Sequence, residues 1–484
     1  MLFNTVGFAI FFFLVFLIYW FVANKDLRLQ NLFLLGASYF FYACWDWRFL
    51  FLLLFSTALD FFTGIKIGGT ENKRRRKCWF LLSICVNLGF LGLFKYYNFF
   101  ALSFARALEH LGLQVHPWTL QVILPVGISF YTFHGLSYVI DLYRGKIRPE
   151  RNFVDYAVFV GFFPLLVAGP IERATHLLPQ IKRPRRFDYG QAVDGLRQIL
   201  WGLFKKVVIA DGCAGYVNSI FSHPEGYPGS VHLLAALFFA FQIYCDFSGY
   251  SDIALGTARL LGIDLLRNFA FPYFSRDIAE FWRRWHISLT TWFRDYLYIP
   301  LGGSQVGTWK KIRNVFIIFL VSGFWHGANW TFIVWGALNA FFILPSILFR
   351  THRNNLDIVA KGRLLPSVKE FFSMALTFGL TVFAWIFFRS ESLGAAIRYC
   401  KTLFSSSLFT MPDPTDRPRA GFILLAGLFL VVEWLGRQEQ YAIARLGIRW
   451  PVALRWLAYY AIFYFVADRY FFTGTRQQFI YFQF

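Results

Sequence analysis

The chain has 484 residues, of which 57% are hydrophobic and 15% carry a charge, against roughly 25% charged residues in an ordinary soluble protein. Its formal net charge is +21, but the basic residues cluster in short loops between apolar segments, and no nucleic-acid-reading motif is present. A soluble globular protein and a nucleic-acid partner are therefore excluded. Long continuous apolar runs favour an all-α polytopic protein over a β-barrel, with membrane lipids as its surroundings.

Apolar segments recur along the whole chain. The first, residues 6–23, is uncharged and about as long as the shortest bilayer span. Further segments lie at 31–43, 49–65, 78–96, 121–140, 153–169, 192–211, 230–246, 314–325, 330–349, 370–388, 420–435 and 453–471. Neither an internal repeat nor a polar region of domain size separates them, so the sequence predicts a single membrane-embedded domain over residues 1–484.

Basic residues predict the orientation in the membrane. Loop 66–77 contains Lys66 and the basic run Lys73–Lys77, and cytoplasmic loops are enriched in Lys and Arg. Counting back through three segments places the N-terminus outside the cytoplasm and places Lys25 and Arg28 inside, which agrees with the same rule.

Segment 153–169 does not fit a simple alternation of spans. Basic residues flank it on both sides, from Arg144 to Arg151 and from Lys182 to Arg186, and it contains Pro164 and Gly169. Two interpretations stay open. The segment either enters and leaves on one side, which requires shelter inside protein, or crosses as an ordinary helix.

The stretch Gln242–Asp252 brings Asp246, Asp252 and several hydroxyl groups to the end of an apolar segment. A metal site is disfavoured because no histidine stands at ligand spacing. We interpret both carboxylates as hydrogen-bond acceptors for backbone groups or as caps of a helix start. The six cysteines are scattered without a C-x-x-C pair, so we expect neither a disulfide nor a structural metal.

Region 264–313 is basic and rich in aromatic residues at helical spacing, among them Phe281, Trp285 and Trp292. One interpretation is an amphipathic helix that lies in the cytoplasmic interface. The alternative is that the region forms the cytoplasmic rim of a reaction chamber and attracts a polyanionic donor.

Two histidines are the candidates for chemistry. His326 lies between two apolar segments, where an ionisable side chain is costly and suggests function, and His286 precedes it in region 264–313. Transfer of an acyl group to a hydroxyl needs a general base, the usual role of histidine, and hydrogen-bond donors for the developing oxyanion. Asn329, Trp325 and Trp330 are close enough in sequence to supply N–H donors. Gly323 and Gly327 would allow close approach of substrate or of a neighbouring helix.

A structural role for His326, satisfied by a nearby carbonyl, is the competing interpretation. His134 also lies in an apolar segment but lacks a cluster of polar neighbours. The remaining histidines lie in loops or near segment ends and are not expected to act. A G-x-S-x-G motif, a P-loop and a dinucleotide-binding glycine motif are missing from the sequence.

Several motifs in this order resemble those of the membrane-bound O-acyltransferase family, and within it the bacterial branch of alginate O-acetyltransferase-type proteins. They are Pro125–Phe133, Phe163–Pro164 through Ala168–Ile171, Gln242–Asp252, Asn268–Phe269 to Pro272–Tyr273, Phe281–Leu289, Tyr298–Gly303, Gly323–Trp330 and Phe479–Phe484. The resemblance runs from about residue 30 to the C-terminus, and the motif-bearing core spans about 121–350.

The resemblance implies a ring of tilted helices around a funnel, with re-entrant segments and an active site near mid-membrane. The family's catalytic histidine maps onto His326, and its second, more variable polar position maps onto His286. Further residues expected to line the donor or acceptor path are Trp325, Asn329, Trp330, Tyr244, Asp246, Arg283 and Arg284. No bound cofactor or metal is expected.

The function implied is acetyl transfer from a cytosolic thioester, acetyl-CoA, across the bacterial inner membrane to an extracytoplasmic polysaccharide such as alginate. A periplasmic acetyltransferase partner would assist, and the N-terminus would be periplasmic. D-alanyl transfer to teichoic acid from a carrier protein and O-acetylation of peptidoglycan are alternatives of the same chemistry. A transporter or flippase is the alternative from a different class, disfavoured by the missing repeat and by few acidic residues within the apolar segments, mainly Asp60 and Glu433.

Overall fold

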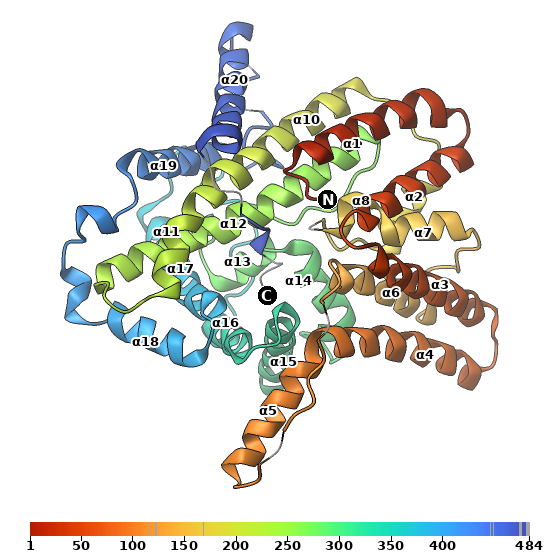
Figure 1. Ribbon diagram of the computed structural model, residues 1–484, viewed down its shortest axis with the longest axis horizontal. Helices are drawn as coiled ribbons and strands as arrows, with labels where there is room; N and C mark the ends of the chain where they lie inside the picture. The colour runs from red at the N-terminus through yellow and green to blue at the C-terminus, as the bar shows by residue number, and fades with distance from the viewer. Residues whose placement is uncertain are drawn as a thin grey trace. The chain divides into compact units, whose positions relative to one another are not determined.

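The computed structural model describes residues 1–114, 116–121, 123–167, 169–445, 447–448, 450–473 and 477–480, and every regular element within them is helical (Figure 1). The helices form two compact units, one of residues Met1–Gly195 with Ala254–Leu266 and the other of Leu196–Ile253 with Arg267–Phe484. The prediction of an all-α protein is confirmed. The ring around a funnel and the single domain stay predictions.

The first unit holds the N-terminal helices, together with the start of α10 and the end of α12. Its helices are α1 (Val6–Leu17), α2 (Leu27–Ala43), α3 (Trp47–Gly69), α4 (Lys73–Leu91), α5 (Tyr97–His110), α6 (Ile128–Tyr143), α7 (Phe153–Gly161), α8 (Phe163–Leu166) and α9 (Ala174–Ile181). Short 3₁₀ or π turns, η1 (Ile18–Val22), η2 (Ala23–Lys25) and η3 (Gly92–Tyr96), extend α1 and α4.

The second unit holds the remaining helices and both candidate histidines. The long helices α10 (Tyr189–Leu203) and α12 (Gly229–Leu260) contribute to both units. The others are α11 (Asp211–Ser222), α13 (Ile278–Arg284), α14 (Ile287–Phe293), α15 (Thr308–His326), α16 (Trp330–Leu348), α17 (Val368–Arg389), α18 (Leu393–Leu403), α19 (Ala420–Leu435) and α20 (Val452–Asp468). Short turns are η4 (Phe204–Ala210), η5 (Pro272–Phe274), η6 (Arg294–Tyr298), η7 (Ser406–Phe409), η8 (Pro414–Asp416) and η9 (Arg469–Thr473).

Among the described residues, 7 helical stretches are long and apolar enough to cross a membrane. They are Val6–Lys25, Trp47–Gly69, Lys73–His110, Gly229–Leu260, Trp330–Leu348, Val368–Arg389 and Pro414–Leu435. The chain is thus a multi-pass membrane protein. The other predicted segments also contain helices, but these are shorter, broken or charged. The first two turns of α15, for example, contain Lys310, Lys311 and Arg313.

The structure favours the re-entrant interpretation of segment 153–169. Its helix breaks at Phe162 (φ −55°, ψ 115°) into α7 of 9 residues and α8 of 4 residues, both too short to cross a bilayer. Tyr156, Phe159 and Phe163 are fully buried, and the amide of Phe163, freed by the break, donates to the Ser38 hydroxyl at 3.2 Å. Non-helical backbone is thereby sheltered inside protein.

A buried carboxyl joins three helices of the first unit. Asp60 of α3 accepts hydrogen bonds from Ser83 (2.6 Å) and Asn87 (2.8 Å) of α4. On its other side lies Gly135 of α6, where a Cβ would overlap the Asp60 carboxylate. Asp60 therefore has hydrogen-bond partners that account for its place in an apolar segment.

Candidate functional site

His286 lies at a break between two short helices of the second unit. Trp285 is extended (φ −101°, ψ 128°), and His286 adopts the left-handed conformation (φ 42°, ψ 55°) before α14 begins. Asn268 holds the break, because its carbonyl accepts from the Ile287 amide (2.8 Å) and its side chain accepts from the Ser288 hydroxyl (2.6 Å). Positive φ at a non-glycine residue costs of order 1–3 kcal/mol and persists only where the surroundings fix it.

The prediction of one amphipathic interfacial helix in region 264–313 is therefore wrong. The region forms an irregular segment, then α13, α14 and η6. The aromatic side chains of α13 and its end are buried rather than interfacial, since Phe281 and Trp285 are each 1% exposed. Helical spacing of aromatic residues fits a buried helix as well as an interfacial one. The second interpretation, the rim of a reaction chamber, stays a prediction.

His326 ends α15, at a point where this helix touches α16. A Cβ on Gly323 would overlap the carbonyl of Phe332, and a Cβ on Gly336 would overlap the carbonyl of Phe319. Gly327 likewise leaves room for the Phe332 ring. The expectation that Gly323 and Gly327 allow a neighbouring helix to approach is confirmed, and the contact fixes the end of α15 that carries His326.

The two histidines flank one indole ring. The Trp325 ring centroid lies 6.0 Å from that of His286 and 4.8 Å from that of His326. Phe247 of α12 meets His286 edge-on at 4.6 Å and 90°. Trp335 of α16 and Phe388 of α17 lie 5.1 and 5.2 Å from His326. We call these two histidines and the aromatic rings around them, Trp325, Phe247, Trp335 and Phe388, the histidine chamber.

Both imidazoles are removed from solvent, with residue exposures of 1% for His286 and 5% for His326. Among the described residues, neither ring nitrogen of His286 has a hydrogen-bond partner. Burial lowers the pKa of His286 from its ordinary value of 6.5 to about 3, because the apolar surroundings disfavour the imidazolium. His286 is therefore neutral, with one N–H to donate and one nitrogen to accept.

Some residues near His326 in sequence face the histidine chamber, whereas others cap a helix or lie at the surface. Asn329 is the N-cap of α16, because its side chain accepts from the Thr331 amide (3.1 Å), and its Nδ2 donates to the Glu391 carbonyl (2.9 Å). Trp330 is 51% exposed. Of the N–H donors predicted from sequence, Trp325 is the one that lies in the chamber, whereas the Asn329 amide already has protein partners.

Trp282 of α13 is a second indole beside the chamber that the sequence analysis did not single out. Its ring lies 5.6 Å from that of Trp335, and its buried Nε1–H finds no acceptor within the described part of the chain. Trp335 and Phe388 were also missed. With aromatic residues at 21% of the sequence, no composition signal separates those that line a site from those that fill a core.

Tyr244 and Asp246 of α12 belong to a buried cluster of charged and polar side chains that connects α12 to η4 and α19. The Tyr244 hydroxyl donates to Glu433 of α19 at 2.6 Å. Asp246 pairs with Lys206 (2.7 Å) and accepts from the Ile480 amide (2.6 Å). The backbone acceptor role expected for Asp246 is thus confirmed.

The alternative role expected for Asp246 and Asp252, capping a helix start, is wrong. Both lie inside α12 rather than at its first turn. Asp252 pairs with Lys205 at 2.6 Å. The sequence signal for this cluster was the lysine pair inside apolar segment 192–211, since buried lysines require charged partners.

Arg283 and Arg284 lie on α13, and protein acceptors hold their guanidinium groups. Arg283 donates to the carbonyls of His352 (2.9 Å) and Asn355 (2.8 Å). Arg284 forms an ion pair with the buried carboxylate of Glu280 at 2.7 Å. Arg283 therefore holds loop 350–357 against α13, and Arg284 stabilises α13 itself. The role expected for both arginines along the donor path stays a prediction.

The remaining histidines do not join the chamber. His134 of the first unit is fully buried and accepts from the Glu172 amide at 3.2 Å, which accounts for its place in an apolar segment. Within the described ranges, no group of three or more His, Cys, Asp or Glu could hold a metal ion. Of the quoted motifs, Ala168 and Tyr481–Phe484 lie outside the described residues.

Comparison with known proteins gives consistent matches. Residues 146–389 match the model of the membrane-bound O-acyltransferase family. The chain is 38% identical to a probable alginate O-acetylase of Pseudomonas aeruginosa, over 91% of this chain and 82% of the relative. It is 35% identical to a peptidoglycan O-acetyltransferase of Helicobacter pylori, over 83% of this chain and 79% of the relative. A teichoic acid D-alanyltransferase of Bacillus subtilis is 29% identical over 44% of this chain and 57% of the relative.

The family match covers the histidine chamber, because both His286 and His326 fall inside residues 146–389. The transporter alternative is therefore set aside. The chain belongs to the membrane-bound O-acyltransferase family and is a multi-pass membrane O-acyltransferase.

Proposed function

We propose that this protein transfers an acetyl group from acetyl-CoA in the cytosol to hydroxyl groups of an extracytoplasmic polysaccharide. The observation that carries the proposal is the buried pair His286 and His326 on either side of Trp325. Relatives named alginate O-acetylase and peptidoglycan O-acetyltransferase support acetyl as the group and a polysaccharide as the acceptor. Acetyl-CoA acts as co-substrate, and no bound cofactor is required.

In the proposed mechanism His326 is the general base. Its imidazole takes the proton of the acceptor hydroxyl while the oxygen attacks the thioester carbonyl carbon, so that a C–O bond forms and the C–S bond breaks. The thiolate leaves and takes up that proton, which yields the acetyl ester and free coenzyme A. Neutral His286 is a weak base but a good N–H donor, and we assign it to stabilising the carbonyl oxygen as negative charge develops there.

The proposed setting is the bacterial inner membrane, with the N-terminus in the periplasm. The basic loop 66–77 supports this orientation. A periplasmic acetyltransferase would assist delivery to the polysaccharide, since the acceptor lies on the far side of the membrane from the thioester pool.

Two relatives define the competing substrates. Peptidoglycan as acceptor rests on the Helicobacter pylori protein, which matches over most of its length. D-alanyl transfer from a carrier protein rests on the Bacillus subtilis protein, which matches less than half of this chain. The coverage therefore favours acetyl transfer.

The test is release of coenzyme A from labelled acetyl-CoA by the purified protein in lipid nanodiscs, with His326→Ala and His286→Gln beside the wild type. We expect release by the wild type and a loss of about 10²-fold or more in His326→Ala, the usual contribution of a general base. Release that persists in His326→Ala would contradict the assignment of the base. Release only with a charged carrier protein would replace acetyl-CoA by that donor.

A further inference from the structure

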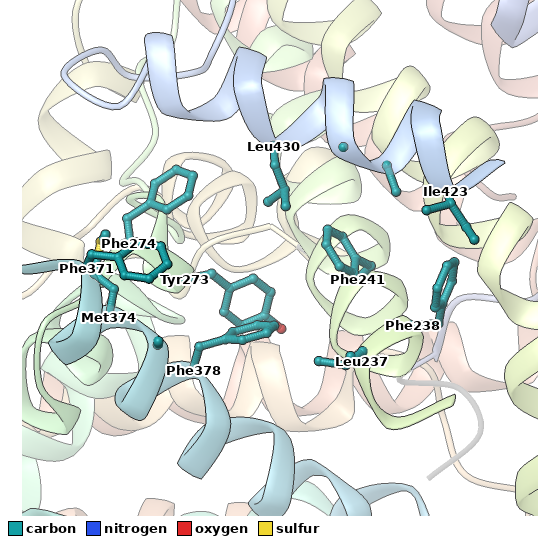
Figure 2. A pocket seen from close by; sticks show the side chains of 13 residues that line it. Leu237, Phe238, Phe241, Tyr273, Phe274, Phe371, Met374, Phe378, Ile423 and Leu430 are labelled. Carbon is teal, nitrogen blue, oxygen red and sulfur yellow. The ribbon is translucent and has the colours of Figure 1, made fainter. Parts of the chain in front are cut away.

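An apolar cavity of about 430 Å³ lies within the second unit between α12, α17 and α19. Figure 2 shows Phe238 and Phe241 of α12, Phe378 of α17 and Ile423 of α19 directed toward the same space. Its volume falls in the range of roughly 300–1,000 Å³ that is usual for ligand sites. The cavity is separate from the histidine chamber.

The lining suits hydrocarbon and nothing polar. Among the described residues that line the cavity, none carries a charge. Its polar side chain, Tyr273, already donates its hydroxyl to the Ala240 carbonyl at 2.7 Å. A sugar or a peptide bound there would leave its own polar groups without hydrogen-bond partners. Each such group costs roughly several kcal/mol in an apolar environment.

The three helices around the cavity identify the source of the hydrocarbon. Each of α12, α17 and α19 lies in a stretch long and apolar enough to span a membrane. The space between them is therefore at the depth of lipid acyl chains, which are as apolar as leucine side chains. Left empty, its walls would lose dispersion contacts that an acyl chain supplies.

One wall of the cavity also borders the aromatic residues beside His286. The Tyr273 ring centroid lies 5.0 Å from that of Phe378, 5.2 Å from that of Tyr244 and 6.0 Å from that of Trp285. Trp285 directly precedes His286 in the chain. An occupant of the cavity thus packs against Tyr273, whose ring also lies beside Trp285.

We propose that this cavity binds one acyl chain of a bilayer phospholipid as a defined site. The inference concerns a ligand outside the acyl-transfer reaction and does not depend on which donor or acceptor the enzyme uses. A polyprenyl chain of a carrier lipid would also be hydrocarbon, and the experiment below separates the two.

Gly427 offers a way to fill the cavity without disturbing its walls. It lies in α19 and lines the cavity, and a Cβ built on it has no atom within 4 Å. Gly427→Leu therefore places a side chain in the space of the acyl chain. Gly379→Leu is the matched control, because Gly379 lies inside α17, also has open space around its Cβ, and does not line the cavity.

The experiment uses a phospholipid with a photoactivatable diazirine in its acyl chain, in nanodiscs of phosphatidylethanolamine and phosphatidylglycerol, with cross-links mapped by mass spectrometry. We expect label concentrated on the cavity residues of α12, α17 and α19 in the wild type and in Gly379→Leu. In Gly427→Leu that label should fall about tenfold, equivalent to ~1.4 kcal/mol of binding free energy. Thermal unfolding of both variants confirms that they are folded.

Three results would overturn the proposal. One is cavity labelling that is equal in Gly427→Leu and in the wild type. Another is label spread evenly over all lipid-exposed helices. The third is preferential labelling of the cavity by a diazirine-bearing polyprenyl phosphate at equal mole fraction, which would assign the site to a carrier lipid instead.

Discussion

His286 combines an unusual backbone conformation with a fully buried and unprotonated ring. Its positive φ places the imidazole between Phe247 and Trp325 rather than along the face of a continuous helix. Strained residues of this kind are maintained where the surrounding structure fixes them, and they cluster at functional sites. The conformation and burial of His286 therefore support the role proposed for it as a donor to the oxyanion.

The pH dependence of stability tests the buried state of His286. Its pKa is about 3 in the folded protein against 6.5 when exposed, so below pH 6.5 the unfolded chain binds a proton that the folded chain does not. Stability should fall as pH decreases from 6.5 toward 3, by at most about 1.4 kcal/mol per pH unit from this group. Unfolding of the wild type and of His286→Asn in detergent between pH 7 and 5 measures this slope.

Asn is the suitable replacement because it tolerates the left-handed conformation. The variant should show a shallower decline than the wild type over this window. Identical slopes for the two proteins would show that His286 is accessible to protons in the folded state.

The activity of the same variant separates chemistry from backbone strain. We expect His286→Asn to fold and to lose about 10²-fold in coenzyme A release, the usual cost of removing a donor to an oxyanion. His286→Gly, which relieves the positive φ and removes the ring, should lose at least as much. Full activity in His286→Gly would mean that the backbone, and not the imidazole, matters at this position.

Several residues of the candidate site were recognisable from sequence, for physical reasons that differ between residues. His326 was recognisable because an imidazole between apolar segments is costly. Gly323 was recognisable because a glycine one turn before His326 permits close contact with a neighbouring helix. Asn329 is predicted as a donor to the site. The structure shows that its side-chain oxygen caps α16 and that its Nδ2 donates to the Glu391 carbonyl, and its role toward substrate stays a prediction. The neighbours of the histidines from α16 and α17 are distant in sequence and carry no local signal.

At the scale of elements, close contact between α15 and α16 decides where His326 lies. Both backbones meet through Gly323 and Gly336, so neither position has room for a side chain. The end of α15 is thereby held by backbone atoms, which cannot adjust as flexible side chains do.

Gly323→Ala should therefore destabilise the protein although alanine is the better helix former. The preference for Ala over Gly in a helix is worth about 1 kcal/mol, whereas overpacking against the Phe332 carbonyl costs about 1–3 kcal/mol and displaces His326. Thermal unfolding and coenzyme A release should both decrease. Gly379→Ala, with open space around its Cβ, serves as control and should be neutral or slightly stabilising.

Removing one partner of the buried ion pair between Lys205 and Asp252 should destabilise the protein more than replacing both partners. Both residues are buried and their charged atoms lie 2.6 Å apart, so Asp252→Leu alone should cost about 3–5 kcal/mol because it leaves an uncompensated ammonium. The double variant Lys205→Met with Asp252→Leu should recover most of this loss in a double-mutant cycle. Additive losses would show that water or another carboxylate compensates Lys205.

The positions at which helices break could not be predicted from the sequence. The hydrophobic periodicity on both sides of Phe162 and of His286 is the same whether the helix continues or breaks there, so the pattern does not reveal the break. What interrupts the helices is tertiary: the Ser38 hydroxyl accepts the freed amide at one break, and Asn268 pairs with the backbone at the other. The apolar segments themselves were recognised, because their length and lack of charge reflect the membrane directly.

For the whole molecule, the orientation in the membrane is the prediction with the widest consequences. With loop 66–77 in the cytoplasm, the turn after α2 that contains the exposed Cys44 lies outside. A membrane-impermeant maleimide should label Cys44 in intact spheroplasts, and should label an engineered Glu71→Cys only after permeabilisation. Cys44→Ser provides the background, and the reverse pattern would invert the orientation and the side from which the thioester enters.

The buried lysines of η4 have a consequence for biogenesis. Each lysine near the centre of a helix opposes insertion by the translocon by roughly 2.5–3.5 kcal/mol. Lys206 has one partner within its own segment, Asp211 at 2.8 Å, but Asp252, which pairs with Lys205, and Asp246, the second partner of Lys206, both lie in α12. We therefore expect the segment around η4 to enter the bilayer together with α12, as one hairpin, because α12 carries the carboxylates of Asp246 and Asp252 that compensate the two lysines.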